Sequence, residues 1–228
     1  MGIFVNNYMI TDQYLTSDIE PLVPEQTIAN ALEQMNKFHI DILPVVHQHH
    51  LINYAEFETI AHLNPETRLS ELEQYSTVLP VVNSGQHLLH ALTHLKSLNV
   101  SLMAVIDEDG EYLGILKTKD VVKALSSSLS IKSSGSIIVL SMRPNDYSLS
   151  DLSRVIEYSD AKILGCFIFE VEDSNELEVH LKLNTTTLKH ILATLERYDY
   201  KVTKYFNRED LTDDLDERYE NLMNFIDN

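Results

Sequence analysis

Residues 27–63 read TIANALEQMNKFHIDILPVVHQHHLINYAEFETIAHL, and residues 87–125 read HLLHALTHLKSLNVSLMAVIDEDGEYLGILKTKDVVKAL, which is the same pattern a second time. The two copies align at an offset of 60 residues, so that Ala31-Leu32 matches Ala91-Leu92. After a one-residue insertion, Ile52 matches Leu113. A repeat of this kind predicts one structural unit built twice.

Each copy is predicted to run helix, strand, hairpin, strand, helix. Apolar residues recur three and four positions apart between Ile28 and Met35, which is the spacing of one helix face. The segments Ile42 to Val46 and Leu102 to Ile106 are short and β-rich, as strands are. Asp107-Glu-Asp-Gly110 predicts the hairpin turn, because Asp and Gly tolerate positive φ.

The repeat resembles a tandem pair of CBS domains, also called a Bateman module, which binds adenine nucleotides in its cleft. The resemblance is carried by ILPVV at 42–46 and by DEDGEYLGILKTKD at 107–120, and it covers roughly residues 8–128. It implies that residues 1–72 fold as CBS repeat 1 and that residues 73–128 fold as CBS repeat 2.

The resemblance also implies a ligand site in the second copy. In that family a final Asp binds the ribose hydroxyls and a Ser or Thr three residues earlier assists near the phosphate; here these positions hold Asp120 and Lys117. Lys117 can hold a phosphate as a point charge, and Ser101 is a third candidate lining the same cleft. The alternatives stay open, since Asp120 can also act as a helix cap and a lysine is more often simply exposed.

The first copy departs from the ligand-binding pattern. It has Asn53 where the family has Gly, Glu56 at the hydroxyl position and Thr59 at the Asp position. A carboxylate at Glu56 repels phosphate, so this site is expected to be degenerate.

A change of composition follows the repeat. SSSLSIKSSGS at 126–136 is typical of a flexible linker, which we assign to 129–136.

Residues 137–206 are predicted to run β-α-β-β-α-β, which resembles an ACT domain, a ferredoxin-like module that senses amino acids and other small ligands. The family's ligand turn is represented by MRPNDY at 142–147, with Arg143, Asn145 and Asp146 as ligand candidates. Asn145 can supply positive φ, but the usual Gly is missing, so an ACT-like domain used only for dimerisation is the alternative.

Residues 207–228 are predicted to form an acidic C-terminal helix. Leu211, Leu215, Leu222 and Ile226 give an apolar stripe beside Tyr219. A lone helix of this length is marginal in water, so the stripe is expected to pack on its own domain or on a second subunit.

Charge and cysteine content exclude several function classes. The formal net charge is -18, which disfavours duplex nucleic acid and anionic membranes as partners. Residues 76–135 are neutral, with five acidic and five basic residues, so a phosphate is expected there rather than elsewhere. No long apolar run or leader is present, and the one cysteine, Cys166, excludes an intrachain disulfide; we expect a soluble cytoplasmic protein.

No metal or catalytic site is predicted. His47, His49 and His50 lie together in one turn, and His87, His90 and His94 share one helix, but no Cys or patterned carboxylate completes either set. Motifs for phosphate loops, serine hydrolases and zinc proteases are absent from the sequence.

The expected protein is therefore an α+β, non-enzymatic regulator similar in architecture to the acetoin-utilisation type of CBS–ACT protein. It is expected to be a homodimer that has no cofactor, senses AMP, ADP, ATP or S-adenosylmethionine and acts on an unidentified partner enzyme. The competing hypothesis is a structural dimerisation module with degenerate ligand sites.

Overall fold

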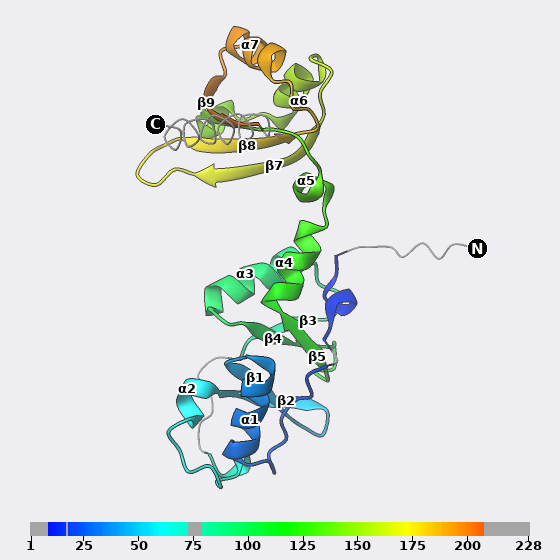
Figure 1. The fold of residues 1–228 in the computed structure, drawn as a ribbon, viewed down its shortest axis with the longest axis vertical. Helices are drawn as coiled ribbons and strands as arrows, with labels where there is room; N and C mark the ends of the chain where they lie inside the picture. The colour runs from blue at the N-terminus through cyan, green and yellow to red at the C-terminus, as the bar shows by residue number, and fades with distance from the viewer. Residues whose placement is uncertain (1–8, 17, 73–78, 208–228) are drawn as a thin grey trace, which may run out of the picture. The chain divides into compact units, whose positions relative to one another are not determined.

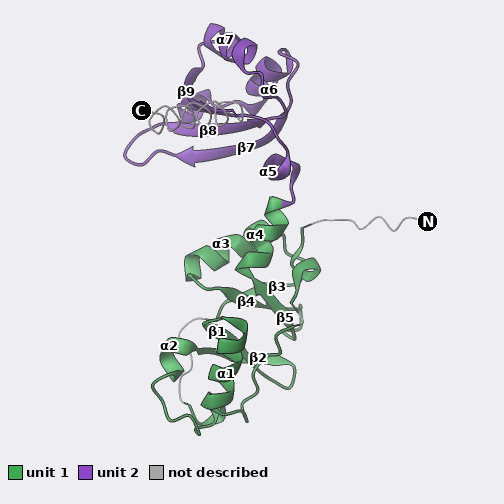
Figure 2. Ribbon diagram, viewed as in Figure 1, with its two compact units in different colours: residues 1–126 green, residues 127–228 purple. Residues whose placement is uncertain are grey.

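The computed structural model describes residues 9–16, 18–72 and 79–207 (Figure 1). The chain forms two compact units, residues 1–126 and residues 127–228 (Figure 2). Both units combine helices with β-sheets, so the predicted α+β class is confirmed. The predicted C-terminal helix lies outside the described residues. None of the helices within the described ranges has both the length and the apolar character needed to span a bilayer.

Unit 1 contains the repeat, and each copy has the predicted order of helix, strand, hairpin, strand and helix. A 3-10 turn, η1 (Thr11–Tyr14), precedes the first copy, another, η2 (Leu69–Glu71), follows it, and a short strand, β3 (Val81–Asn83), precedes the second. The first copy consists of α1 (Ile28–Phe38), β1 (Ile42–His47), β2 (His50–Glu56) and α2 (Phe57–Ile60). The second copy consists of α3 (Leu88–Leu98), β4 (Leu102–Ile106), β5 (Tyr112–Lys117) and α4 (Thr118–Ser126).

Equivalent positions in the two copies have equivalent conformations. Helix α1 ends at His39 and α3 at Asn99, and both residues adopt a left-handed conformation, with φ of 53° and 52°. Such a residue ends a helix by turning its amide back onto the last carbonyls, as both do here. The first residues of the helices, Ile28 and Leu88, are both fully buried. The backbone conformation therefore repeats at the same 60-residue offset as the sequence.

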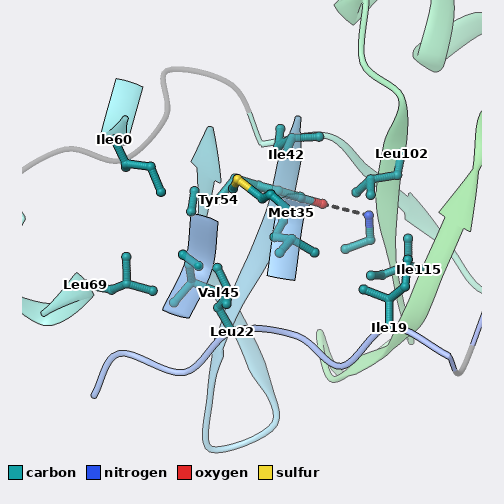
Figure 3. Packing of buried hydrophobic residues seen from close by; sticks show 14 of the residues in the cluster. Ile19, Leu22, Met35, Ile42, Val45, Tyr54, Ile60, Leu69, Leu102 and Ile115 are labelled. Atoms are coloured by element: carbon teal, nitrogen blue, oxygen red, sulfur yellow. Dashed lines mark hydrogen bonds between the residues drawn. The ribbon is translucent and has the colours of Figure 1, made fainter. Parts of the chain in front are cut away.

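The two copies share a hydrophobic core. Leu102 and Ile115 of the second copy belong to the same buried cluster as Leu43 and Tyr54 of the first. The Tyr54 hydroxyl accepts a 2.7 Å hydrogen bond from the Ala104 amide, drawn as the dashed line in Figure 3. The same hydroxyl donates to the Pro80 carbonyl, which lies just before β3. The core of the first copy therefore includes side chains of the second, while the second copy also has a buried cluster of its own.

The residues that precede the first copy pack on the second. Leu88 donates its amide to the Met9 carbonyl at 2.8 Å, and Thr16 donates its amide to the Ile115 carbonyl at 2.8 Å. The predicted boundary of repeat 1 at residues 1–72 therefore includes a segment, 9–16, that lies beside the sequence of repeat 2.

Unit 2 is a four-stranded antiparallel sheet with the strand order β7-β8-β6-β9. Together with the helix positions, this is the ferredoxin-like β-α-β-β-α-β topology predicted from the sequence. A short helix, α5, precedes the sheet inside the segment expected to be a linker. The bounds are α5 (Leu129–Lys132), β6 (Ile137–Met142), η3 (Pro144–Asp146), α6 (Leu149–Glu157), β7 (Ile163–Glu170), β8 (Leu177–Leu183), α7 (Lys189–Arg197) and β9 (Lys201–Phe206).

The strand register shows which side chains lie on each of the two faces of this sheet. Side chains alternate between faces along a strand, and directly paired residues share a face. Leu140 pairs with Val179, and both belong to the buried cluster that α6 and α7 complete through Leu152 and Ile191. We call the opposite face, which carries Phe167 and His180, the open face of the sheet.

Candidate functional site

Asp120 lies in the first turn of α4, where it contacts two polar side chains. Its carboxylate accepts a 3.1 Å hydrogen bond from the Thr16 hydroxyl. The Lys117 ammonium lies 3.7 Å from the same carboxylate oxygen. Two of the three residues predicted for the ligand site, Lys117 and Asp120, are therefore adjacent.

The local backbone explains why these side chains meet. Strand β5 ends at Lys117, opposite Leu102 at the start of β4, and α4 begins at the next residue. The Thr118 amide donates to the Ser101 carbonyl at 2.9 Å, which fixes the turn from strand to helix. Lys117 and Asp120 are three residues apart across this turn, and a carboxylate in a first helical turn is favoured by the helix dipole.

The site has unused hydrogen-bonding capacity. The Asp120 side chain is 27% exposed and the Lys117 side chain 12%. A carboxylate offers about four acceptor positions and an ammonium three donors, more than the contacts with Thr16 and Lys117 occupy. The carboxylate can accept hydroxyl donors from a ligand while the ammonium receives an anion.

The structure places the Ser101 hydroxyl elsewhere. It donates a 2.5 Å hydrogen bond to the Asp41 carboxylate of the first copy. Asp41 precedes Ser101 by 60 residues, so two equivalent positions of the repeat bind each other. Ser101 stands beside the site through its backbone, while its side chain connects the two copies.

The position equivalent to Lys117 carries the opposite charge in the first copy, where it is Glu56. Glu56 ends β2 and pairs with Ile42, in the same register as Lys117 and Leu102 in the second copy. The position equivalent to Asp120 holds Thr59, which is exposed on α2. An anionic group therefore meets a carboxylate in the first copy and an ammonium in the second.

A pocket of about 460 Å³ lies on the surface of the first copy beside α1. Asp18, Glu20 and Glu33 line it, against a single basic side chain, Lys37. Because three carboxylates repel a phosphate, this pocket is a poor site for a nucleotide.

Sequence reasoning missed Thr16. The residue lies ahead of both copies of the repeat, so the 60-residue alignment assigns it no role. Only the return of residues 9–16 to the second copy brings its hydroxyl to Asp120. No motif or periodicity in the sequence indicates this contact.

The turn predicted as the ACT-like ligand loop has a different geometry from the expected one. Pro144–Asp146 form a 3-10 turn, η3, and Asn145 is not among the residues with positive φ in the described chain. The expectation of a left-handed Asn145 is wrong, because Pro144 at the first position favours a right-handed turn instead. Arg143, Asn145 and Asp146 are all exposed.

Arg143 acts electrostatically on Glu176. The pKa of Glu176 is lowered mainly by a 2.6 Å hydrogen bond from the Ser141 hydroxyl and then by Lys201, with a smaller effect of Arg143. The Arg143 charge is therefore close to a carboxylate of its own unit.

Histidines and the cysteine have ordinary structural surroundings. Within 9–16, 18–72 and 79–207, no group of three His, Cys, Asp or Glu residues has the geometry to hold a metal ion. A ring nitrogen of His87 accepts from the Leu89 amide at the start of α3, and one of His50 lies 3.2 Å from the Gly110 carbonyl oxygen. Cys166 is half-buried, with the Tyr147 hydroxyl 3.8 Å from its sulfur.

Comparison with known proteins finds a family-model match to the second copy. Residues 69–127 match the family model of the CBS domain. No curated protein matches the chain. Among solved structures, a CBS domain pair/ACT domain protein from Thermotoga maritima is similar at 19% identity, over 51% of this chain and 96% of that one, with a TM-score of 0.47.

Two further solved structures are similar to about half of the chain. The CBS domains of a transcriptional regulator from Streptococcus pneumoniae share 14% identity over 50% of this chain and 97% of that one, with a TM-score of 0.45. CBSX2, solved in complex with AMP, shares 21% identity over 51% of this chain and 95% of that one, with a TM-score of 0.41.

Proposed function

We propose that unit 1 binds an adenosyl ligand in the second copy, beside Asp120, and that the protein is a non-catalytic regulator. The observation that carries this proposal is the contact of Thr16 and Lys117 with Asp120 at the first turn of α4. Lys117 and Asp120 lie within the segment 69–127 that matches the CBS domain model, whereas Thr16 lies ahead of it. The resemblance of that segment to adenine-nucleotide sites motivates the choice of ligand.

Each side chain has a distinct role in this proposal. The Asp120 carboxylate accepts hydrogen bonds from the two ribose hydroxyls, and a bidentate contact of this kind fixes the sugar. Lys117 leaves the carboxylate and holds the first phosphate or another anionic group of the ligand. Thr16 releases or shares its hydrogen bond, so binding changes the contact between residues 9–16 and α4.

That change is the proposed signal. A ligand shifts a conformational equilibrium only through different contacts with the two states. Here the contact is the hydrogen bond between Thr16 and Asp120, because it joins a separate segment to the binding residue. The response would pass to a homodimer interface or to a partner enzyme. Unit 2 is proposed to serve as an ACT-like domain, with Arg143, Asn145 and Asp146 as its candidate ligand loop.

The experiment is thermal melting of the full chain with and without AMP, ADP, ATP or S-adenosylmethionine. A ligand at about 100 times its Kd stabilises the native state by about 2.7 kcal/mol and raises the melting temperature. Asp120→Ala should abolish the rise, whereas Asp109→Ala, which removes the same charge from the exposed β4–β5 hairpin, should retain it. No rise with any of the four ligands would contradict the proposal.

A structural dimerisation module is the second candidate, and Glu56 is the observation that favours it. This carboxylate stands where the first copy would need a hydroxyl or a cation, so one of the two sites has lost its ligand chemistry. A dimer by light scattering, combined with flat melting curves for all four ligands, would select this candidate.

A further inference from the structure

The open face of the unit 2 sheet carries a small hollow beside α5. Phe167 and Phe169 are two residues apart on β7, so their side chains lie on the same face. They are 46% and 52% exposed. Together with Ile131 of α5 and Ile137 of β6, they line a cavity of about 270 Å³. Its lining is therefore mainly aromatic and apolar, as the lining of small-molecule sites is.

Elements of unit 2 alone bound this hollow. Helix α5 lies beside β7 (Figure 1), and its Ser130 side chain packs directly on Gly165 of that strand. The neighbouring part of the open face is covered, since Val139, which pairs with His180, is only 3% exposed. None of the described residues that line the hollow belongs to the predicted ligand turn at 142–147. The hollow is therefore a local feature of the open face, separate from that turn.

His180 lines the hollow and separates it from the nearest carboxylate. Its ring meets Phe169 edge-on, with the ring centroids 4.9 Å apart. Its Nε2 atom lies 3.4 Å from the carboxylate of Glu178. Glu178 shares the open face, but none of the described residues that line the hollow is acidic. A ligand in the hollow therefore meets aromatic rings without meeting a carboxylate of the lining.

Lys182 supplies the positive charge of the hollow. Its ammonium donates to the Gly135 carbonyl at 3.0 Å, and an ammonium has three donors, so capacity remains for a second acceptor. The residue is half-buried, and among the residues that the structure describes no carboxylate forms an ion pair with it. A half-buried charge without a counter-ion costs free energy. An anionic group bound in the hollow would supply that counter-ion.

We propose that this hollow binds a small aromatic monocarboxylate, with its ring against Phe167 and Phe169 and its carboxylate on Lys182. Aromatic pairs gain free energy beyond the area they bury, which favours a ring over an aliphatic chain. The volume of about 270 Å³ is below the roughly 300–1,000 Å³ of pockets for drug-sized ligands, which favours a compound smaller than a nucleotide. The site lies in unit 2, and the proposal is independent of ligand binding at Asp120.

Titration of the isotopically labelled full chain with phenylacetate, followed by NMR spectroscopy, tests this proposal. We expect saturable shifts of the amide signals of residues 130–131, 167–169 and 180–182. Phenylacetamide has the same shape without the charge, so it should bind roughly tenfold more weakly, on the scale of a lost hydrogen bond between charged groups. Shifts confined to residues 117–120, no saturable shift, or equal affinity for the two compounds would overturn the proposal.

Matched lysine substitutions separate this site from a general attraction of anions. Lys182→Gln removes the charge and keeps a hydrogen-bond donor, so the affinity for phenylacetate should fall roughly tenfold while that for phenylacetamide stays the same. Lys189→Gln removes a charge from α7, on the other side of the sheet, and should change neither affinity. An unchanged affinity for phenylacetate in Lys182→Gln, or an equal loss in Lys189→Gln, would overturn the assignment of the carboxylate to Lys182.

A matched pair of phenylalanine substitutions tests the contact with the ring. Phe167→Ala removes part of the aromatic lining and should weaken the binding of both compounds severalfold. Phe206→Ala removes a phenylalanine of the same face that is 55% exposed and lines a different hollow, and it should leave both affinities unchanged. Equal effects of the two substitutions would overturn the placement of the ring.

Discussion

The Tyr54 hydroxyl and the Ala104 amide join the two copies of the repeat at the centre of unit 1, at 2.7 Å. The position equivalent to Tyr54 in the second copy holds Ile115, so the hydrogen bond has no symmetric counterpart there. The repeated fold therefore depends on a side chain that is not repeated.

Replacing this hydroxyl should destabilise unit 1 by a limited amount. In Tyr54→Phe the Ala104 amide keeps its 3.0 Å bond to the Pro80 carbonyl, so no backbone group is left alone. We expect a loss of about 0.5–1.5 kcal/mol, the net value of one hydrogen bond, in urea unfolding followed by circular dichroism.

Tyr112→Phe is the matched comparison, and it should not destabilise unit 1. The Tyr112 hydroxyl is buried and has no hydrogen-bond partner among the residues that the structure describes. Removing a buried, unpaired polar group is neutral or stabilising. Equal destabilisation by both substitutions would show that the hydroxyl at Tyr54 has no special role.

Stability should fall in alkaline solution because of the same two tyrosines. Burial raises the pKa of Tyr54 and of Tyr112 far above the ordinary value of 10.0. Their neutral forms therefore stabilise the fold below about pH 10, and this contribution is lost as the pH rises from there towards the folded pKa, since the unfolded chain ionises first. Unfolding midpoints at pH 8, 10 and 11 should decline, and decline less in the Tyr54→Phe/Tyr112→Phe double variant. Parallel declines in both proteins would assign the effect to other groups.

Much of the backbone was predictable from the sequence, because local patterns set it. Alternating apolar residues in β8 and the β-rich run Lys201–Phe206 predict those strands with the observed bounds. The ends of α1 and α3 follow from the repeat. The structural role of Tyr54 was not predictable, since its partners lie on segments 26 and 50 residues away.

The candidate site was predictable only in part, for a related reason. Lys117 and Asp120 are three residues apart, so a strand-to-helix turn brings them together. Thr16 reaches Asp120 across 104 residues of sequence, and no periodicity indicates such a contact. For Asn145 the local prediction was wrong. It considered only that Asn tolerates positive φ and left out the neighbouring Pro144, which favours a right-handed turn.

A glycine in β7 allows α5 to pack against the sheet. A Cβ atom at Gly165 would lie 2.6 Å from the Cβ atom of Ser130, which is closer than two carbon atoms approach without displacement. Gly165→Ala should therefore displace α5 and increase amide hydrogen exchange at 129–133 by at least severalfold.

Ser130→Gly provides the control for this prediction. It removes the clashing Cβ atom, so the double variant Gly165→Ala/Ser130→Gly should exchange more slowly than Gly165→Ala alone. If the second substitution gave no recovery, contact between these two residues would not be what holds α5.

Replacing Lys117 should lower the affinity for phosphorylated ligands and leave the affinity for the nucleoside nearly unchanged. In Lys117→Gln the ammonium is lost while hydrogen-bonding capacity remains, so affinity for AMP or ATP should fall by roughly tenfold, the effect of about 1.4 kcal/mol. Affinity for adenosine should change little. Competition binding measures both, and an equal loss for adenosine and AMP would place the phosphate away from Lys117.

Isothermal titration of the full chain tests the central proposal most directly, using the adenosyl compound that gives the largest rise in melting temperature. We predict one ligand per chain, because Glu56 and Thr59 remove the equivalent chemistry from the first copy. Asp120→Ala should weaken binding by roughly tenfold or more, on the scale of lost hydrogen bonds to a charged group, while Asp109→Ala binds as the unmodified chain does. Two ligands per chain, or equal affinity in Asp120→Ala, would contradict the assignment of the site to Asp120.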